Sequence, residues 1–416
     1  MKKAGFILFL VLILVITGCQ QSSKTNGSSK KQKELRIINY RVEDKAYYDE
    51  LNKKFQEKYP DIKIKYDSVP TKDYQVLFNS RTAAGEVDLV AGAKDYIRTE
   101  KSRDMFMDLT GKPVLSKYKK EALKLEEVKG KNYLVPWNNV AMVTFYNKKI
   151  LKELNIEMPK TWDEFKSAAQ KAKKKGYMPV VFGGKDQWPI AMPVNELEAT
   201  MVRSKDSKFN DKLRDGETKF TDPVWVDMLS RLKELGSLFQ QNSAGLAYGQ
   251  APGIFAQGKA AFMVDGSWSA SQITAANPKL DYGVMNLPGS NNADDNKNLG
   301  VKSGGGWMVT KDSPNKDAAM KYLDFISEKE NYEKYINFTK SIPVMDGVKV
   351  GKEISMVEEL VNANNVIPVW ESTFIPGAKY DFVNLGMKLI SNNITPEKAA
   401  EQMQKDLEGS KKYWKE

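Results

Sequence analysis

Apolar residues change their spacing several times between residues 34 and 95, and each change indicates a new element. The stretch LRIINY at 35–40 is rich in β-branched residues, which favours a strand. Residues 47–59 then carry an apolar side chain every four positions, a spacing typical of one face of a helix. The stretch IKIKYDSV at 62–69 alternates apolar with polar residues and predicts a second strand.

The same alternation continues with a helix and a third strand. Residues 73–84 form a polar helical segment that Gly85 ends, and VDLVAGA at 87–93 has the composition of a buried strand. Strands that alternate with helices predict an α/β fold with a parallel sheet flanked by helices. In such sheets ligands bind beyond the carboxyl ends of the strands.

Charged residues follow two of the predicted strands at that edge. Arg41 and Glu43 come directly after the first strand, and Asp95 comes directly after the third. The carboxyl ends of neighbouring parallel strands meet at one edge of the sheet. We therefore expect these three side chains to bind a polar ligand.

The chain opens with an apolar run that predicts a targeting signal. Two lysines precede residues 6–16, which contain no polar side chain. A membrane-spanning helix needs roughly 18 or more apolar residues, so we predict a signal peptide over residues 1–18. The sequence ITGC at its end resembles the bacterial lipobox, which implies that Cys19 becomes the lipidated first residue of the mature protein. An ordinary cleaved signal beside an incidental thiol is the alternative.

Residues 19–33 have the composition of a flexible tether. After Cys19 they contain polar residues and glycine only, so they can bury too little surface to offset the entropy of ordering. We predict a lipid-anchored linker over 19–33 and a folded part that begins at Glu34. No later run is long and apolar enough to cross a bilayer. The folded part is therefore expected outside the cytoplasmic membrane, and the lipobox and lysine content fit a Gram-positive envelope.

Composition excludes several kinds of chemistry. The 416 residues contain no histidine, and Cys19 is the single cysteine. Ser-His and Cys-His nucleophile pairs, histidine-rich or cysteine-rich zinc sites and an internal disulfide are thus excluded. The glycine-rich SGGGW at 303–307 lacks the Lys-Ser/Thr of a phosphate-binding loop. We expect no cofactor and no metal, and the enzyme chemistry left open is that of paired carboxylates, as in glycosidases.

The positive charge of the chain does not indicate a nucleic-acid partner. The formal net charge is +11, and removal of the two lysines of residues 1–18 leaves +9. The lysines are spread along the chain and alternate with glutamates, and no arginine-rich or aromatic–basic motif is present. We interpret the lysines as a solvated surface and expect no nucleic acid among the partners.

Four stretches of the chain resemble the extracellular solute-binding proteins of family 1, the group similar to maltose-binding protein. The stretch YLVPWNNVAMVTFYNKKILKELNIEMPKTWDEF at 133–165 resembles the most recognisable part of that family. FAQGKAAFMVDGSW at 255–268 and GGGWMVTKDSPNKDAAMKYLDFI at 304–326 are similar to its second and third signatures. NNITPEKAAEQMQKDLE at 392–408 resembles its final helix. The stretches occur in the same order as in the family, and the resemblance covers nearly all of the mature chain.

The resemblance implies a two-lobed periplasmic-binding-protein-like fold of type II. Each lobe would be a mainly parallel sheet flanked by helices, with a solute in the cleft between the lobes and a hinge that the chain crosses three times. Transferred to this sequence, the first lobe comprises residues 34–138 and 287–343, and the second comprises 139–286 and 344–416. The crossings are expected near 138–140, within 287–299 and near 344–347.

The resemblance also implies that the solute is a carbohydrate. A sugar presents apolar C–H faces, which stack on aromatic rings, and a fringe of hydroxyl groups, which bind to charged and amide side chains. Trp268 is the first candidate for stacking, because family members place an aromatic residue in the GSW turn. The further aromatic candidates and their acidic neighbour are Trp188, Trp370, Trp137, Trp307 and Glu371. For each tryptophan, burial in a core is the alternative.

The candidates for binding hydroxyl groups come from the strand ends and from the expected hinge. They are Arg41, Glu43, Asp95 and Asn138, with Asp265 and Lys185 as further candidates. Arg41, Glu43 and Asp95 also follow from the strand pattern independently of the family.

Together these features predict the lipid-anchored binding component of an ABC importer. We expect a monomer that captures a carbohydrate, in particular an oligosaccharide, and delivers it to a membrane permease. Capture of another polar solute, such as a polyamine or an amino-acid derivative, is an alternative within the same fold. A lipid-anchored glycosidase and a sensor or adhesin that presents a bound ligand are the alternatives from other classes.

Overall fold

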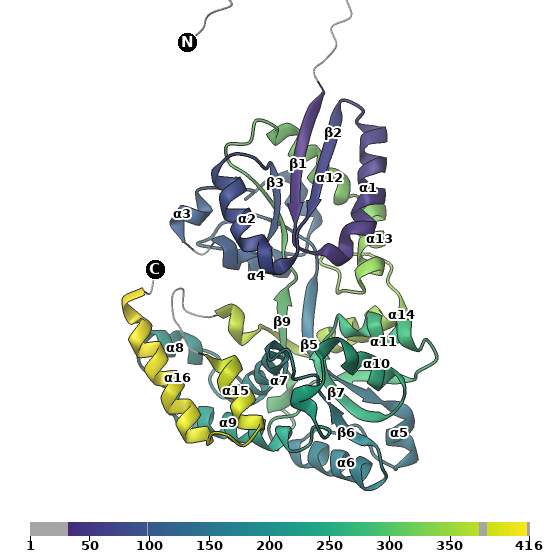
Figure 1. Ribbon diagram of the computed structural model, residues 1–416, viewed down its shortest axis with the longest axis vertical. Helices are drawn as coiled ribbons and strands as arrows, with labels where there is room; N and C mark the ends of the chain where they lie inside the picture. The colour runs from purple at the N-terminus through teal and green to yellow at the C-terminus, as the bar shows by residue number, and fades with distance from the viewer. Residues whose placement is uncertain (1–31, 98, 374–380, 414–416) are drawn as a thin grey trace, which may run out of the picture.

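The chain folds into two lobes, one above the other in Figure 1, and each lobe has its own β-sheet. This computed structural model describes residues 32–97, 99–373 and 381–413. Cys19 and most of the expected linker lie outside the described residues, so lipid attachment stays a prediction. Within the described ranges, no helix is both long and apolar enough to cross a membrane.

The first lobe is built on a five-stranded sheet with the strand order β2-β1-β3-β10-β4. Strands β1 and β2 pair in parallel over their full lengths, and β1 also pairs in parallel with β3, as the alternating pattern predicts. Strand β10 runs antiparallel to both β3 and β4. The strands are β1 (Lys33–Asn39), β2 (Ile62–Ser68), β3 (Leu89–Gly92), β4 (Val135–Pro136) and β10 (Gly306–Val309).

Helices pack on both faces of this sheet and bury their apolar sides (Figure 1). In α1 the apolar positions every four residues form the buried face, since Leu51 and Phe55 are almost inaccessible to solvent. The helices of the first lobe are α1 (Lys45–Lys58), α2 (Thr71–Ala83), α3 (Glu100–Arg103), α4 (Lys120–Glu126), α12 (Lys316–Ile326) and α13 (Lys329–Thr339).

The second lobe contains a sheet with the order β11-β9-β5-β7-β6, and β8 pairs with β5. Strand β5 runs antiparallel to β7, β8 and β9, whereas β6 with β7 and β9 with β11 are parallel pairs. The expectation of mainly parallel sheets therefore needs correction, because β5 and β10 pair with their neighbours in the opposite direction. The strands are β5 (Asn139–Asn147), β6 (Met178–Val181), β7 (Ala260–Gly266), β8 (Tyr282–Met285), β9 (Asn298–Ser303) and β11 (Asn365–Pro368).

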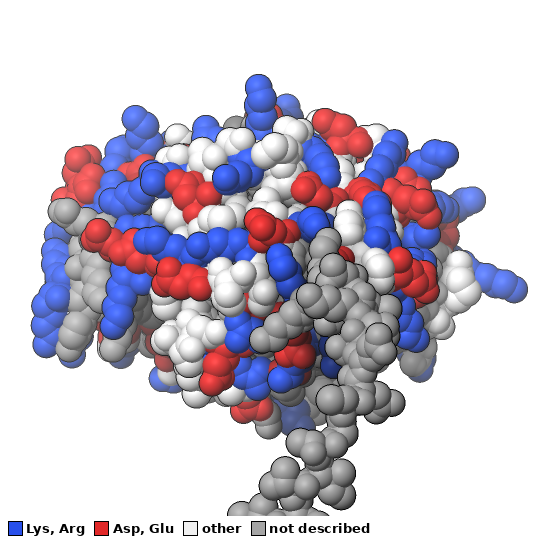
Figure 2. All heavy atoms as spheres, turned by 90° about the horizontal axis from the view of Figure 1, so that it is seen from above, with Lys and Arg blue, Asp and Glu red and all other residues white. Residues whose placement is uncertain are grey.

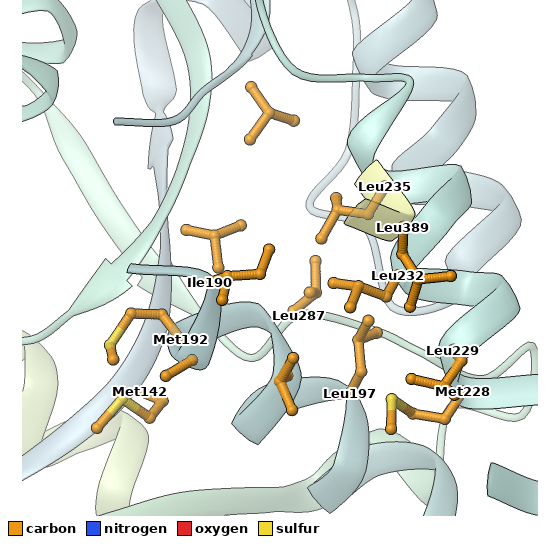
Figure 3. Close-up of a cluster of buried hydrophobic side chains, with 14 of the residues drawn as sticks. Met142, Ile190, Met192, Leu197, Met228, Leu229, Leu232, Leu235, Leu287 and Leu389 are labelled. Carbon is orange, nitrogen blue, oxygen red and sulfur yellow. The ribbon is translucent and has the colours of Figure 1, made fainter. Parts of the chain in front are cut away.

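The core of the second lobe lies between this sheet and helices that come from distant parts of the chain. Figure 3 shows Leu232 and Leu235 of α9 beside Leu389 of α15, with Leu287 and Leu197 completing the cluster. The helices of this lobe are α5 (Lys148–Glu153), α6 (Trp162–Lys174), α7 (Ala191–Leu197), α8 (Phe209–Asp215), α9 (Pro223–Gly236), α10 (Ala251–Ala256), α11 (Ser269–Ala276), α14 (Lys352–Asn362), α15 (Phe382–Ile390) and α16 (Pro396–Ser410).

Three segments pass between the lobes side by side. Asn139, at the start of β5, pairs with Ser303 at the end of β9 and forms a bridge with Ile342. The backbone N–H of Asn139 donates to the carbonyl oxygen of Ile342 at 2.9 Å, and that of Ile342 donates back at 3.1 Å. The second crossing lies at 303–306, later than the expected 287–299, because β9 stays in the sheet of the second lobe up to Ser303. The remaining lobe boundaries stay predictions.

Charged side chains of both signs mix on the surface of the first lobe. Figure 2, which views the molecule from above, shows lysine and arginine side chains interspersed with aspartate and glutamate on that face. Several are joined as ion pairs, such as Lys54 with Glu50 and Lys58 with Glu328, each at 2.6 Å. Exposed pairs of this kind contribute little to stability. Their mixture of signs agrees with the interpretation of the lysines as part of a solvated surface.

Candidate functional site

A cleft of about 790 Å³ opens where the crossing segments meet, and both lobes line it. This volume lies within the range of about 300–1,000 Å³ that is usual for small-molecule sites. Charged side chains of both signs line it, and most come from the first lobe. The charged lining residues are Arg41, Asp44, Lys94, Glu126 and Lys302.

The end of β1 supplies one wall of the cleft. Directly after this strand, Arg41 donates from its Nε to the Asp44 carboxylate at 2.6 Å, and the Tyr335 hydroxyl donates to the same carboxylate at 3.1 Å. The ring of Tyr40 packs against Trp137, with 5.8 Å between the ring centroids. Its hydroxyl donates to the carbonyl oxygen of Gly304 at 3.3 Å. Arg41 and Asp44 are thus held in place by the fold before any ligand binds.

The end of β3 supplies the adjoining wall. The Glu126 carboxylate, which is buried at the end of α4, accepts a hydrogen bond from the backbone N–H of Lys94 at 3.0 Å. This contact joins α4 to the short 3₁₀ helix η2 (Lys94–Ile97) that follows β3. Glu43 and Asp95 belong to the turns after β1 and β3, but their side chains lie outside the described part of the structure.

Asn138 lies at the floor of the cleft, at the point where the chain first crosses between the lobes. Its side chain is 1% exposed, and within the described residues neither its amide oxygen nor its amide nitrogen has a hydrogen-bonding partner. A Cβ atom at Gly304 would lie 1.8 Å from the Asn138 Oδ1, so this position of the SGGGW stretch excludes any side chain. An unsatisfied buried amide costs free energy unless a ligand or water completes it.

Trp268 lines the cleft from the second lobe, in the turn between β7 and α11. Its indole Nε1–H donates to the Tyr248 hydroxyl at 2.5 Å. A Cβ atom at Gly266 would fall 2.1–2.3 Å from three atoms of the indole ring, so the ring lies directly against the backbone there. The GSW turn therefore presents a large aromatic ring at the cleft, as the sequence analysis predicts for this position.

Asp265 lies behind Trp268 and does not line the cleft. It is 2% exposed and accepts hydrogen bonds from the Tyr248 hydroxyl, the Ser269 hydroxyl and the Gly266 N–H at 3.0, 2.7 and 2.7 Å. Burial raises the pKa of Asp265 to about 6, although these hydrogen bonds act to lower it. Its candidacy as a hydroxyl-binding residue needs correction, because its oxygens face protein donors.

The sequence profile described as bacterial extracellular solute-binding protein matches residues 40–333 of the chain. The chain belongs to this family. Solute-binding proteins are extracellular and do not catalyse reactions, so the predictions of the family and of a protein that is not an enzyme are confirmed.

Curated relatives align with this solute-binding protein along most of its length. The "Multiple sugar-binding protein" of Streptococcus mutans is 26% identical over 363 residues, which is 84% of each chain. The "Melibiose/raffinose/stachyose-binding protein MelE" of Bacillus subtilis is 23% identical over 416 aligned positions, 96% of this chain and 95% of the relative.

Solved structures confirm the two-lobed type II fold. A structure titled "Chitin oligosaccharide binding protein" superposes with a TM-score of 0.77 at 25% identity, covering 91% of this chain and 98% of that one. The putative binding protein msme from Bacillus subtilis, in an open conformation, has a TM-score of 0.80 at 19% identity and covers 92% and 99%.

The structure brings three of the candidate residues to the cleft of the solute-binding protein and buries others elsewhere. Arg41, Asn138 and Trp268 line the cleft. The exposed Trp188 lies outside the lining, with its ring centroid 4.5 Å from that of Tyr248. The exposed Lys185 also lies outside it.

The remaining tryptophan candidates need correction. Trp370 is 1% exposed and packs against Trp225 in the core of the second lobe, so burial rather than ligand contact explains it. Trp307 and Trp137 are also buried and pack against each other beneath Tyr40. Glu371 lies outside the lining but pairs with Lys302, which is part of it, at 2.9 Å.

Two charged lining residues have no signal in the sequence pattern. Glu126 reaches the cleft only through the packing of α4, and Asp44 only through the turn after β1. Lys94, in contrast, stands beside Asp95 at the end of β3, where the strand pattern predicts contacts with a ligand. Phe338, near the end of α13, lines it with 45% of its surface exposed. Within the described residues, no cluster of three or more carboxylate, cysteine or histidine side chains could hold a metal ion.

Proposed function

We propose that this solute-binding protein captures an oligosaccharide in the cleft and delivers it to the permease of an ABC importer. Two relatives support a carbohydrate ligand, since one is named for binding multiple sugars and the other for binding melibiose, raffinose and stachyose. The cleft supports it chemically, since aromatic rings, the indole of Trp268 among them, and many polar groups line the same space. Apolar C–H faces of a pyranose stack on such a ring, and its hydroxyls bind the polar groups.

The observation that carries the proposal is that Trp268 and several charged side chains line one cleft, with the amide of Asn138, unpartnered among the described residues, beside it. An amide presents an acceptor and two donors, and a pair of neighbouring sugar hydroxyls can donate to the oxygen and accept from the nitrogen. Arg41, Asp44 and Glu126 supply charged groups in the same cleft, and hydrogen bonds to charged groups are about twice as strong as neutral ones. A carbohydrate fits this combination of a ring and paired donors and acceptors.

Capture would work as a shift between open and closed arrangements of the lobes. A ligand that contacts both lobes binds the closed arrangement more tightly and so raises its population. The crossings beside Asn139 are short extended segments that absorb such a rotation, and Asn138 and Ser303 in these segments also line the cleft. The ligand and the hinge therefore share residues, which would couple binding to closure.

Lipid anchoring through Cys19 is part of the same proposal. An anchored receptor stays close to its permease, and two acyl chains suffice for stable membrane attachment. We expect a monomer on a Gram-positive surface, with the predicted lobe boundaries changed only at the second crossing, which lies at 303–306. Expression of the full chain in a bacterium tests the anchor: Cys19→Ser should move the protein from the membrane fraction to the medium, and retention of C19S in the membrane would contradict it.

The ligand is tested by a thermal-shift screen of the purified protein with mono- and oligosaccharides, and with polyamines and amino acids as controls. A ligand at about 100 times its Kd stabilises the protein by roughly 2.7 kcal/mol, an easily measured shift. Trp268→Ala should weaken binding on the order of 100-fold, as loss of a central aromatic contact does. Tyr177→Ala, a surface aromatic bonded to Glu153 in the same lobe, should leave the affinity unchanged.

Two outcomes would sink the carbohydrate proposal. If a control solute stabilises the protein and no saccharide does, the fold and the family stand but the ligand class is wrong. If a saccharide binds equally well to W268A and to the unchanged protein, the cleft described here is not its site.

A further inference from the structure

The indole of Trp268 lies in a cradle that the protein builds on several sides. The backbone at Gly266 lies directly against the ring, where any side chain would collide with it. The Nε1–H at its edge donates to the Tyr248 hydroxyl at 2.5 Å. A tryptophan that merely filled space would not need a partner so closely placed, because a half-buried indole N–H can donate to water.

Tyr248 is held in turn by three groups besides Trp268. Its hydroxyl donates to the Asp265 Oδ1 at 3.0 Å while its oxygen accepts the hydrogen bond from Trp268. The ring of Trp188 packs edge-on against it, with centroids 4.5 Å apart and planes at 60°. The backbone N–H of Tyr248 donates to the Asp186 carboxylate at 2.8 Å. The tyrosine therefore has little freedom to turn away from the indole.

Asp265 ends this chain of hydrogen bonds, and the burial of its carboxyl group costs free energy. It is 2% exposed, and no cation pairs with it among the described residues. A buried carboxylate costs free energy unless hydrogen bonds satisfy it, and three donors do so: Tyr248, Ser269 and the Gly266 N–H. An apolar residue would fill the same space without that cost.

We propose that Tyr248 and Asp265 are positioning residues that hold the indole of Trp268 in the orientation required for stacking against a sugar ring. The inference rests on the proposed function, since it gives the buried carboxylate a role in ligand binding. In the chain Trp268 N–H to Tyr248 O–H to Asp265 carboxylate, each hydrogen bond polarises the next. A ring fixed before binding loses less entropy when the ligand arrives.

Tyr248→Phe tests the inference, because it removes the hydroxyl and keeps the ring that packs on Trp188. The first readout is the Trp268 indole N–H resonance in a ¹⁵N–¹H spectrum of the ligand-free protein, assigned with the W268F variant. We expect Y248F and Asp265→Asn to move this resonance upfield and to leave the other indole signals in place. The matched control is Tyr177→Phe, which breaks another tyrosine–carboxylate bond of the same lobe, Tyr177 to Glu153 at 2.8 Å.

The second readout is the affinity for the saccharide identified in the screen. Y248F should weaken binding about 5- to 10-fold, the scale expected when one side chain must be ordered by the ligand. D265N should weaken it less, because an amide oxygen can still accept from Tyr248. The Y248F/D265N double variant should be little worse than Y248F alone, because the two residues act through one chain of hydrogen bonds.

The outcomes separate this inference from the proposed function. An unmoved indole resonance in Y248F, or a moved resonance with unchanged affinity in both Y248F and D265N, overturns the positioning role while W268A still tests the ligand site. Failure of the unchanged protein to bind any saccharide overturns the proposed function and the positioning role together. Thermal melts of each variant without ligand show whether a loss of affinity is simply a loss of fold.

Discussion

Two buried carboxyl groups, one in each lobe, lie in opposite electrostatic surroundings. In the first lobe, Asp88 is fully buried at the start of β3 and accepts hydrogen bonds from Arg36 Nε and Nη2 at 3.0 and 2.8 Å. Ser313 donates to the same carboxylate at 2.7 Å. Burial alone would raise the pKa of Asp88, but the hydrogen bonds and the charge of Arg36 outweigh it and hold that pKa below its ordinary value.

In the second lobe, Glu196 on α7 is buried among neutral donors. Its carboxyl group accepts from the backbone N–H of Leu287 at 2.7 Å and from the Thr144 hydroxyl at 3.3 Å. Burial, together with the nearby charge of Asp265, raises the pKa of Glu196 to about 8. Even Glu198, which forms an ion pair with Arg203, has its pKa raised by burial.

This difference shows that a buried carboxyl group can stabilise the fold in different ranges of pH, depending on its surroundings. A carboxyl group with a lowered pKa stabilises the fold above its unfolded pKa and loses that contribution as the pH falls. A carboxyl group with a raised pKa stabilises the fold below its unfolded pKa and loses that contribution as the pH rises. Asp88 belongs to the first kind, and Glu196 to the second.

The largest expected effect is the pH dependence that Glu196 gives to stability. In the unfolded chain this group loses its proton near its ordinary pKa of 4.5, whereas in the folded protein it keeps the proton up to about pH 8. Between pH 5 and 8 the Glu196 contribution should therefore fall by about 4 kcal/mol as the pH rises. Glu196→Gln, which stays neutral, should remove this slope from the free energy of unfolding measured in urea at several pH values.

A matched control is Glu153→Gln, which changes a glutamate on the surface of the same lobe. Its stability profile should run parallel to that of the unchanged protein. If the E196Q profile is also parallel, Glu196 does not hold a proton in the folded protein and the contrast between the lobes fails.

The next largest effect comes from breaking the paired carboxylate of the first lobe. Arg36→Met leaves the Asp88 charge buried without its cation, which should cost about 3 kcal/mol of unfolding free energy. Adding Asp88→Asn removes the stranded charge and should restore much of that loss. Arg81→Met breaks the more exposed Arg81–Asp67 pair of the same lobe and should cost less than about 1 kcal/mol. Equal losses in R36M and R81M would show that burial of Asp88 does not matter.

Much of the first lobe could be predicted from the sequence because its signals are local. The alternation of 62–69 and the four-residue spacing of 47–59 each depend only on neighbours along the chain, and both elements form as predicted. The strand-end rule also predicted Arg41 at the cleft, since the end of a parallel strand fixes where the next residue lies.

The rest of the site depends on contacts that no local pattern contains. Glu126 ends a short helix whose sequence contains no recognised motif. It reaches the cleft because α4 packs beside the turn after β3. Residue type alone does not distinguish Trp268 from Trp370, yet Trp268 lines the cleft and Trp370 is buried in the core. The resemblance to the family identified Trp268 and Asn138, but it also proposed Trp307, which the first lobe buries.

The lobes also differ in what they present to the ligand. The first lobe supplies four of the five charged side chains of the lining, Arg41, Asp44, Lys94 and Glu126, whereas the second supplies the ring of Trp268 and one charged side chain, Lys302. This division suggests that the first lobe binds mainly hydroxyl groups and that the second also binds an apolar face. Phe338 does not fit it, because this ring belongs to α13 of the first lobe.

The smallest predicted effect tests that exception. Phe338 is 45% exposed in the cleft and packs on Tyr47, with ring centroids 5.7 Å apart. If it forms a second stacking surface, Phe338→Ala should weaken saccharide binding about 5-fold, or about 1 kcal/mol. Phe338→Tyr, which keeps the ring, should bind as the unchanged protein does in isothermal titration calorimetry.

The control for this prediction is Val76→Ala, which removes an exposed apolar side chain of the first lobe outside the cleft. Unchanged affinity in F338A would mean that the first lobe binds only hydroxyl groups and that Phe338 simply covers Tyr47. A loss in F338A that F338Y does not share would mean that both lobes stack on the ligand. The contrast between the lobes would then concern buried charge alone, because the apolar contacts of the cleft would come from both sides.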